Sequence, residues 1–257
     1  MTDRADVAAV ARAAVLAGGT ELRRRYREND DAGDYDAHDV KAAADEAAER
    51  RMLPVIRRAF PDHAVSSEEA GEFGGSEPYR WIVDPLDGTN NFAAGLSTFA
   101  SSVAVRRESE PVVAAVYQPA TDELTIARGG DGVSYDGERV TADSELDALA
   151  STVAMIVGRD VPRDPDRSRR AAAIREGLGT EVKRVVDSWA PTVHSTLFAR
   201  GRIQGLVQFH PDDDEQAVTE LLAAEAGATT RRDGPLYVAA TDERLLETLW
   251  EAIEEAS

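Results

Sequence analysis

The sequence predicts a mixed α/β protein in which an α+β half, residues 1–142, packs on an α/β half, residues 143–257. Three observations predict this fold class. Helical periodicity covers most of residues 2–59. Short apolar runs divided by turn residues begin at about residue 99, and strands alternate with helices beyond about residue 145. No linker, repeat or low-complexity segment divides the chain, so we expect the halves to form one compact unit.

Two helices open the chain. Residues 2–28 place apolar side chains at helical spacing with Asp and Arg between them. A polar loop over residues 28–34 leads to a second helix, residues 42–59. Asp45 falls in the first turn of this helix, where an acid is often no more than a surface residue favoured by the helix dipole.

The most informative stretch of the sequence begins at Trp81-Ile82-Val83, which indicates the end of a buried strand and is followed directly by Asp84. Pro85 has no N–H to give to a neighbouring strand, so strand pairing is expected to stop there. Asp87-Gly88 is a turn signal, and Thr89-Asn90 can cap a helix that starts at this point.

This strand end has a chemical interpretation. Carboxylates bind hard cations such as Mg²⁺, and free N–H groups at a helix start bind phosphate. Metal beside phosphate is the layout of a phosphoryl-transfer site. The alternative is that Asp-x-x-Asp is a solvated pair in a chain with 48 acidic residues, but surface acids rarely follow Trp-Ile-Val and precede Gly-Thr.

Further elements follow in order along the chain. An antiparallel meander is expected over residues 99–105, 112–117, 123–127 and 132–135. Asp164 is a candidate N-cap for a helix that begins at Pro165. In the second half the pattern predicts strands over residues 151–157, 182–186, 203–209 and 236–239, and helices over residues 165–176, from 186 to about 200, 213–226 and 241–254.

Composition excludes several classes of partner. The chain has 257 residues, enough to bury a substantial core, and a formal net charge of −19. This charge repels nucleic acid and anionic membranes, so neither is expected as a partner. An anionic substrate is repelled as well unless bound metal reverses the local sign.

The kinds of residue add three further expectations. Lysine occurs only at Lys41 and Lys183 among many acids, which predicts adaptation to high salt, with an ordinary acidic protein as the alternative. The chain has no cysteine, which excludes disulfides and thiolate chemistry. It shows neither a signal-peptide core nor a membrane-spanning apolar run, so a soluble, cytoplasmic protein is expected.

The segment Asp84-Pro-Leu-Asp87-Gly-Thr89-Asn-Asn-Phe92 resembles the central motif of the inositol monophosphatase family of Mg²⁺-dependent, lithium-sensitive sugar phosphatases. That superfamily also contains fructose-1,6-bisphosphatases and nucleotide 3′-phosphatases. A second element, Ser67-Glu68-Glu69, lies upstream at the expected distance, preceded by Phe60-Pro-Asp-His63. The resemblance is strong over residues 39–135 and architectural beyond. It implies the family's layered α-β-α-β-α sandwich, and the composition suggests a halophilic archaeal member.

The resemblance implies a set of metal ligands. Glu68, Asp84 and the main-chain carbonyl of Leu86 would bind a first Mg²⁺. Asp84 would bridge to a second ion that Asp87 also ligates, and Glu68 would help to hold a third ion through water. The two aspartates are separated by two residues, whereas those of haloacid-dehalogenase phosphatases are separated by one, which argues against an aspartyl-phosphate nucleophile.

The resemblance also implies catalytic roles. The substrate phosphate would sit on the N–H groups of Gly88 and Thr89. The Thr89 hydroxyl and Asp45 would accept a proton from the attacking water, with Glu68 as a further catalytic residue. The context Lys41-Ala-Ala-Ala44 before Asp45 departs from the family's Thr-x-x-Asp pattern, although the spacing to Glu68 matches.

A larger departure lies near the second metal. Family members have Trp-Asp ahead of a helix that ends in Glu-Ala-Gly-Gly, and this Asp is a metal ligand. Counting back from Glu225 puts Glu215 at the Asp position and Asp214 at the Trp position. Glu215 can ligate with its longer arm, or a slip can present Asp213 or Asp212. The alternative is a helix N-terminal charge cluster without a metal.

The substrate side matches the family poorly. Gln208 stands where inositol-specific members carry a hydroxyl-binding Glu, and Asp34 falls where some members have a basic residue. The four histidines, His38, His63, His194 and His210, are interpreted as structural or surface residues.

The sequence therefore predicts a Mg²⁺-dependent phosphomonoesterase acting on a small sugar or polyol phosphate, with fructose-1,6-bisphosphate or a nucleotide 3′-phosphate as alternatives. A different class of hypothesis is a non-catalytic relative that binds metal and phosphate as a sensor or partner subunit. The family resemblance adds the expectation of a homodimer.

Overall fold

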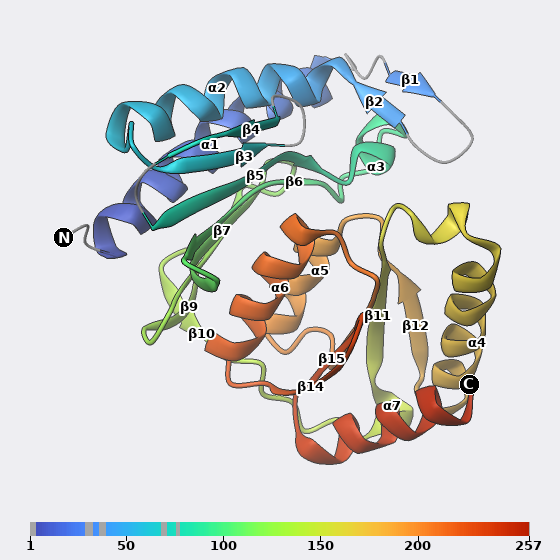
Figure 1. The fold of residues 1–257 in the computed structure, drawn as a ribbon. Helices are drawn as coiled ribbons and strands as arrows, with labels where there is room; N and C mark the ends of the chain where they lie inside the picture. Colours follow the sequence, from blue (N-terminus) through green and yellow to red (C-terminus); the bar gives the residue numbers. More distant parts are fainter. Residues whose placement is uncertain (1–3, 29–32, 36–39, 68–70, 76–77, 257) are drawn as a thin grey trace.

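A computed structural model describes residues 4–28, 33–35, 40–67, 71–75 and 78–256 of the chain. Glu68 and His38 lie outside the described residues. The described elements form five layers, helix–sheet–helix–sheet–helix (Figure 1), as the sequence predicted. None of the described helices is both long and apolar enough to cross a membrane.

The first sheet has eight strands in the order β10-β9-β8-β7-β6-β5-β3-β4. Its strands are β3 (Ala64–Ser67), β4 (Gly71–Phe73), β5 (Tyr79–Asp87), β6 (Ala100–Arg107), β7 (Glu110–Gln118), β8 (Glu123–Arg128), β9 (Gly132–Tyr135) and β10 (Glu138–Val140). The long helices α1 (Arg4–Glu28) and α2 (Ala43–Ala59) cover one face of this sheet, and the hairpin β1 (Gly33–Tyr35) and β2 (Val40–Ala42) lies between them in sequence.

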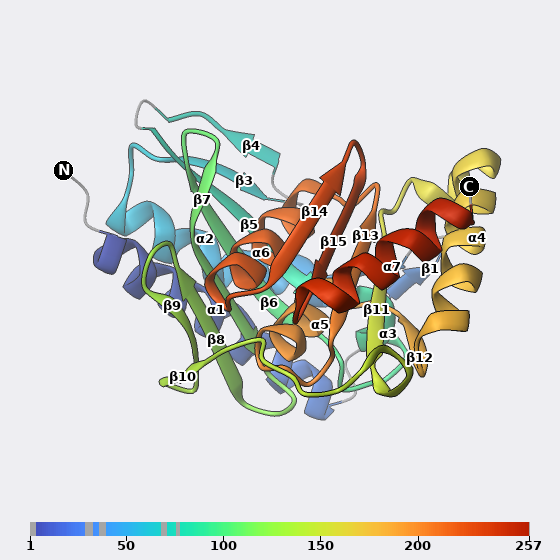
Figure 2. The same ribbon diagram turned by 90° about the horizontal axis from the view of Figure 1, so that it is seen from below.

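The second sheet has five strands in the order β12-β11-β13-β15-β14. They are β11 (Thr152–Val157), β12 (Arg184–Asp187), β13 (Gly205–Phe209), β14 (Thr229–Asp233) and β15 (Leu236–Ala240). Helices α4 (Pro165–Glu181) and α7 (Glu243–Glu255) cover its outer face, seen from below in Figure 2. The boundary predicted at residue 142 falls between β10 and the short helix η1 (Ala148–Ala150), ahead of this sheet.

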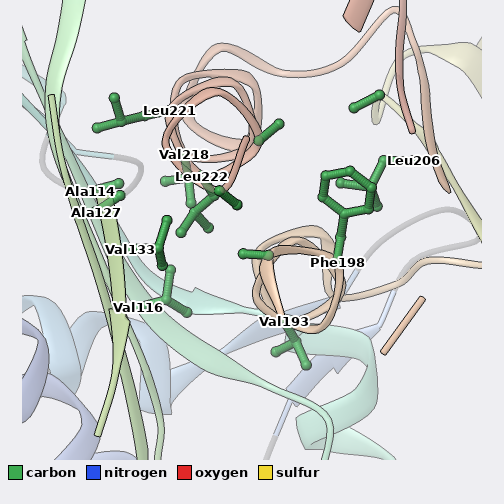
Figure 3. Packing of buried hydrophobic residues seen from close by; sticks show 14 of the residues in the cluster. Ala114, Val116, Ala127, Val133, Val193, Phe198, Leu206, Val218, Leu221 and Leu222 are labelled. Carbon is green, nitrogen blue, oxygen red and sulfur yellow. The ribbon is translucent and has the colours of Figure 1, made fainter. Parts of the chain in front are cut away.

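Helices α5 (Pro191–Ala199) and α6 (Asp213–Glu225) form the layer between the two sheets. Their apolar side chains meet both sheets in one buried cluster, shown in Figure 3, where Val193 and Phe198 of α5 and Val218 of α6 lie between Val116 of the first sheet and Leu206 of the second. This shared core joins the halves, and the loops at the starts of α5 and α6 lie at the junction.

Local sequence explains where several elements start. Asp164 accepts hydrogen bonds from the main-chain N–H groups of Asp166, at 2.9 Å, and Arg167, at 3.1 Å. The N-cap predicted ahead of Pro165 is therefore confirmed. Asp242 caps α7 in the same way, since it accepts from the N–H of Leu245 at 2.9 Å.

One prediction about strands was wrong, and several short strands were not predicted. Strand β5 does not stop at Pro85 but continues to Asp87, because the register with β6 shifts between Asp84 and Asp87 and pairing resumes at Asp87–Ala100. A bulge of this kind leaves residues out of the ladder, and so tolerates a proline without an N–H. The sequence analysis also missed the edge strand β14, whose Thr229–Asp233 run carries no apolar alternation.

The topology brings separate strand ends together. Strand β3 runs parallel to β5 with Ser67 opposite Val83, so β3 ends at the level where β5 reaches Asp84. In the second sheet, β11 runs parallel to both β12 and β13. Carboxyl ends of parallel strands share one edge of a sheet, which is where ligands bind in open α/β folds.

Candidate active site

A cleft of about 730 Å³ lies where the end of β5 faces the carboxyl ends of β11 and β12 and the start of α6. Both halves of the chain contribute to its walls. The first half supplies Asp45, Asp84, Leu86, Asp87, Gly88, Thr89 and Asn90, and the second half supplies Met155, Val157, Gly158, Arg159, Asp160, Pro162, Arg163, Asp187, Ser188, Trp189, Pro191, Asp212, Asp214 and Glu215. Every predicted site residue that the structure describes, apart from Gln208 and the alternative ligand Asp213, therefore lines one cavity.

The bulge at the end of β5 is held by short-range hydrogen bonds. Asp84 Oδ1 accepts from the main-chain N–H of Leu86 at 3.0 Å. The Leu86 carbonyl in turn accepts from the Thr89 hydroxyl at 3.0 Å, and Ser101 Oγ donates to the Pro85 carbonyl at 2.8 Å. These bonds fix the direction of the Asp84 carboxylate and of the Leu86 carbonyl, the two groups predicted to share a metal.

Asp87 has a second role that the sequence did not reveal. Its Oδ2 accepts from the main-chain N–H groups of Thr192, at 2.9 Å, and Val193, at 3.4 Å, and from the Thr192 hydroxyl. These groups form the first turn of α5, so a carboxylate of the first half caps a helix of the second. Burial raises the pKa of Asp87 to about 7, although the bonds from Thr192 favour its charged form.

The acidic side chains at the start of α6 do not all face the cleft. Glu215 and Asp214 line the cleft, and Asp212 lines it while accepting from Arg159 Nε at 2.9 Å. Asp213 does not line it, because its side chain is 68% exposed and pairs with Arg106 at 3.0 Å. Of the alternatives at the second metal position, the arrangement thus favours Glu215 over Asp213.

Glu215 is a buried acid with an unused oxygen. Its Oε2 has no hydrogen-bond partner among the described residues. Burial, followed by the nearby charges of Asp214, Asp212 and Asp87, raises the pKa of Glu215 well above its ordinary value. A buried, unpartnered carboxylate oxygen is costly, and a cation beside it would relieve that cost.

The Asp84 carboxylate is repelled by the charges of several neighbouring acids. Burial is the main reason that its pKa is raised, and the charges of Asp87, Asp214, Asp45 and Glu215 add to it. As they stand, no three acidic or histidine side chains in the described part of the chain are close enough to hold a metal ion. The donor chemistry nonetheless fits Mg²⁺, which prefers carboxylate and carbonyl oxygens. Glu68, the remaining predicted ligand, lies outside the described residues.

The other predicted catalytic residues are placed as follows. Asp45 is buried at the start of α2 and lines the cleft, as does Thr89. The Thr89 hydroxyl donates to the Leu86 carbonyl, so its pairing with Asp45 stays a prediction. Thr89 is the first residue of the short helix α3 (Thr89–Ala93), and Gly88 rather than Thr89 or Asn90 occupies the N-cap position.

Glycine is required at position 88 for two reasons: its backbone φ is positive, and neighbouring atoms leave no room for a Cβ. Its φ of 86° is left-handed, and a Cβ there would lie 2.9 Å from the Thr98 carbonyl and 3.0 Å from Ala190 Cβ. We expect Gly88→Ala to destabilise the fold by about 1–3 kcal/mol, because strain and close contact add. Urea unfolding measures this change.

A matched control separates the two causes. Gly95 also has a positive φ, 71°, but a Cβ there would meet nothing within 4 Å. Gly95→Ala should therefore cost only the strain, and an equal loss in both variants would contradict the role of the close approach at Gly88.

Gln208, His63 and His194 take structural positions. Gln208 is fully buried on β13 and does not line the cleft, so its predicted contact with substrate has no support in this arrangement. His63 accepts from Trp81 Nε1 at 2.9 Å and stacks on Phe60. His194 Nδ1 contacts Ser188 Oγ at 2.7 Å behind the cleft wall.

Sequence reasoning missed several residues of the site, among them Arg159 and Trp189, which line the cleft, and Thr192, which binds Asp87. Arg159 follows the end of β11 after one residue, Gly158, and its main-chain N–H and Nε both donate to Asp212 Oδ2. Burial works against its charge, but Asp212 and Asp214 outweigh burial and raise the pKa of Arg159. Its place at a strand's carboxyl end is the signal that could have identified it.

Comparison with known proteins identifies the family. A model described as the inositol monophosphatase family matches residues 3–254. The chain belongs to the inositol monophosphatase family. The family prediction is confirmed, and as a member of this family the chain is a phosphoric monoester hydrolase.

Curated relatives of the chain include members with two kinds of name. The fructose-1,6-bisphosphatase/inositol-1-monophosphatase of Aquifex aeolicus is 32% identical over 225 residues, covering 85% of this chain and 82% of that protein. The Nus factor SuhB of Escherichia coli K12 is 29% identical over 216 residues, covering 81% of this chain and 78% of that protein.

Solved structures share the fold. The inositol monophosphatase of Anabaena sp. PCC 7120 superposes with a TM-score of 0.83 at 24% identity, covering 99% of this chain and 97% of that one. The suppressor protein suhB of Bartonella henselae gives a TM-score of 0.86 at 24% identity, covering 97% of this chain and 98% of that one. These likenesses show the layered architecture of the inositol monophosphatase family.

Proposed function

We propose that this member of the inositol monophosphatase family hydrolyses a small phosphate monoester in a Mg²⁺-dependent reaction with water as the nucleophile. One observation carries the proposal. The buried acids Asp84, Asp87 and Glu215, from two distant parts of the chain, line a single cleft beside the turn at Gly88. The pKa of each of these acids is raised, which shows that their negative charges are costly where they are buried together. Bound cations would offset that cost.

The residues of this chain then have defined tasks. Asp84, Asp87, Glu215 and the Leu86 carbonyl would supply oxygen ligands, together with Glu68. Bound Mg²⁺ would lower the pKa of water and neutralise charge on the transferred phosphoryl group.

Proton transfer and phosphate binding fall to the neighbouring residues. Asp45, aided by Thr89, accepts the proton of the attacking water. The N–H groups of Gly88 and Thr89 hold the phosphate oxygens, and Arg159 partly offsets the acidic field of the cleft.

The names of the relatives suggest two substrates and, separately, a second function. The Aquifex aeolicus protein is named for fructose-1,6-bisphosphate and inositol-1-phosphate, which keeps a sugar or polyol phosphate as the proposed class. Relatives named Nus factor SuhB support a second candidate, a partner role without catalysis. The gathering of Asp45, Asp84, Asp87, Thr89 and Glu215 in one cleft favours the enzyme. The homodimer, the cytoplasmic location and the adaptation to high salt stay predictions.

The decisive experiment measures phosphate release with Mg²⁺ and with EDTA, in molar KCl, from inositol, fructose, glycerol and adenosine phosphates. We expect release that requires Mg²⁺ and whose Mg²⁺ dependence involves Glu215. Glu215→Gln should raise the Mg²⁺ concentration for half-maximal rate by about tenfold or more, because a neutral amide is a weaker ligand.

Asp213→Asn is the matched control, because Asp213 is on the same helix turn but faces Arg106. It should leave the Mg²⁺ dependence unchanged. A folded wild-type protein that binds Mg²⁺ without releasing phosphate from any of these esters would favour the partner role instead.

A further inference from the structure

A buried pair of hydroxyl groups joins the two helices whose first turns reach the cleft. Ser195 of α5 and Thr219 of α6 are both 0% exposed, and their hydroxyl oxygens lie 2.7 Å apart. Among the described residues, no other side-chain hydrogen bond links α5 to α6. The neighbouring side chains Val193 and Val218 belong to the apolar cluster between the sheets (Figure 3). The hydroxyl pair therefore adds a directional contact to packing that is otherwise non-directional.

This pair is connected to the start of α5. Ser195 Oγ donates its proton to the Pro191 carbonyl at 2.8 Å. The Thr219 hydroxyl must then be the donor to Ser195 Oγ, because a hydroxyl has only one proton to give. Pro191 is the first residue of α5 and lines the cleft. Through Ser195, Thr219 thus reaches the turn of α5 that borders the site.

Both ends of this chain of bonds lie next to a proposed metal ligand. Thr192, which follows Pro191, donates to Asp87 from its main-chain N–H at 2.9 Å and from its hydroxyl. On α6, Glu215 precedes Thr219 by four residues, so the two side chains share one face of the helix, about 6 Å apart along its axis. The charge of Asp87 acts on Glu215, so the two carboxylates are near each other. A shift of α5 along α6 would change their separation.

Stability alone gives little reason for a hydroxyl pair in this position. Two buried hydroxyls gain little over apolar side chains of the same shape, because both lose their hydrogen bonds to water when the chain folds. What the pair adds is a fixed direction and distance between the helices, which apolar packing does not specify. A positioning role accounts for this feature.

We propose that Ser195 and Thr219 are positioning residues that hold Asp87 and Glu215 at the separation that a shared Mg²⁺ ion requires. The inference rests on the proposed Mg²⁺-dependent function and adds two residues to it. Neither of them lines the cleft. They act only through the first turns of α5 and α6, and touch neither metal nor substrate.

Mg²⁺ binding, measured by calorimetry on the full chain, tests this role without turnover. Thr219→Val removes the hydroxyl and keeps nearly the same shape. We expect it to raise the dissociation constant for Mg²⁺ by about 2- to 30-fold, the range for substitutions that alter coupling through packed side chains. Ser195→Ala should act in the same direction, and the double variant should be no worse than Ser195→Ala alone, because both substitutions remove the same bond. Thr219→Ser, which keeps the hydroxyl, should retain most of the wild-type affinity.

Thr196→Val is the matched control. Thr196 follows Ser195 on α5 and is also fully buried, but its hydroxyl accepts from Gln118 Nε2 of β7 at 3.2 Å. The substitution therefore removes a buried hydroxyl from the same helix and leaves the bond between α5 and α6 in place. It should lower the midpoint of urea unfolding, as Thr219→Val does, and leave the dissociation constant for Mg²⁺ unchanged.

The outcomes separate this role from the phosphatase function. If the wild type releases phosphate and Thr219→Val binds Mg²⁺ as tightly as the wild type, or Thr196→Val weakens binding equally, the positioning role alone is overturned. A wild type that binds Mg²⁺ but releases phosphate from no ester would overturn the phosphatase function, and weaker Mg²⁺ binding confined to the Ser195 and Thr219 variants would still support the positioning role. A folded wild type that binds no Mg²⁺ would overturn both.

Discussion

Asp84→Asn is expected to lower Mg²⁺-dependent phosphate release by about 100- to 1000-fold, the range typical for removing one preorganised electrostatic group from an active site. Asparagine keeps the shape of the side chain, and its Oδ1 can still accept from the N–H of Leu86. The variant therefore removes the central negative charge of the cleft without removing the bond that shapes the bulge.

The same variant should be more stable than the wild type when metal is absent. Burial and the neighbouring acids Asp87 and Asp214 raise the pKa of Asp84, so the folded wild type carries an electrostatic cost that a neutral amide does not. Lower activity together with higher metal-free stability identifies a charge kept for function.

Both effects can be measured on one preparation. Phosphate release gives the activity, and urea unfolding in EDTA gives the stability. Asp122→Asn serves as the control, because Asp122 pairs with Arg23 on the surface, away from the cleft. Reduced stability of Asp84→Asn in EDTA would refute the electrostatic account even if activity fell.

Metal-free protein is expected to lose stability as the pH rises from about 4 to about 7, by a few kcal/mol. Burial raises the pKa of Asp87 from 3.8 to about 7. Between these values the folded state holds a proton that the unfolded state has released, so rising pH favours unfolding until Asp87 is ionised in both states. Asp84 and Glu215 shift in the same direction.

Mg²⁺ should reverse this loss at the upper end of the range, because metal binds deprotonated carboxylates. At a concentration 100-fold above the dissociation constant the gain is about 2.7 kcal/mol. Thermal unfolding with Mg²⁺ and with EDTA at several pH values checks the prediction. A metal-free stability that increased over this window would contradict the assignment of raised pKa values to these acids.

Much of the fold follows from local sequence, as particular elements show. Helix α4 begins where Asp164 and Pro165 predicted, because the side-chain cap and the fixed proline φ act within one turn. Strand β14 could not be found in this way. Its Thr229–Asp233 run is exposed and polar, and it is a strand only because it pairs with β15 at the edge of the sheet.

The site residues likewise fall into those that local sequence predicts and those that only tertiary structure brings to the site. Asp84, Asp87 and Thr89 were recognisable because they lie in one contiguous motif, whereas Arg159 reaches the cleft, and Thr192 reaches Asp87, only through tertiary structure. The choice between Asp213 and Glu215 is instructive. Residues two apart on a helix project about 200° from each other, so only one of the two could face the cleft, and the packing of α6 decides which one.

The bond between Asp87 and the first turn of α5 joins residues 105 positions apart, and this separation affects the order of events during synthesis. The recognisable motif is complete by Phe92, but Asp87 acquires its partner only after Thr192 has been made, and the opposing carboxylate of Glu215 comes later still. Contacts so distant in sequence form late, because a long loop must close first. A nascent chain that carries the whole motif would therefore have no working centre until most of the second half has left the ribosome.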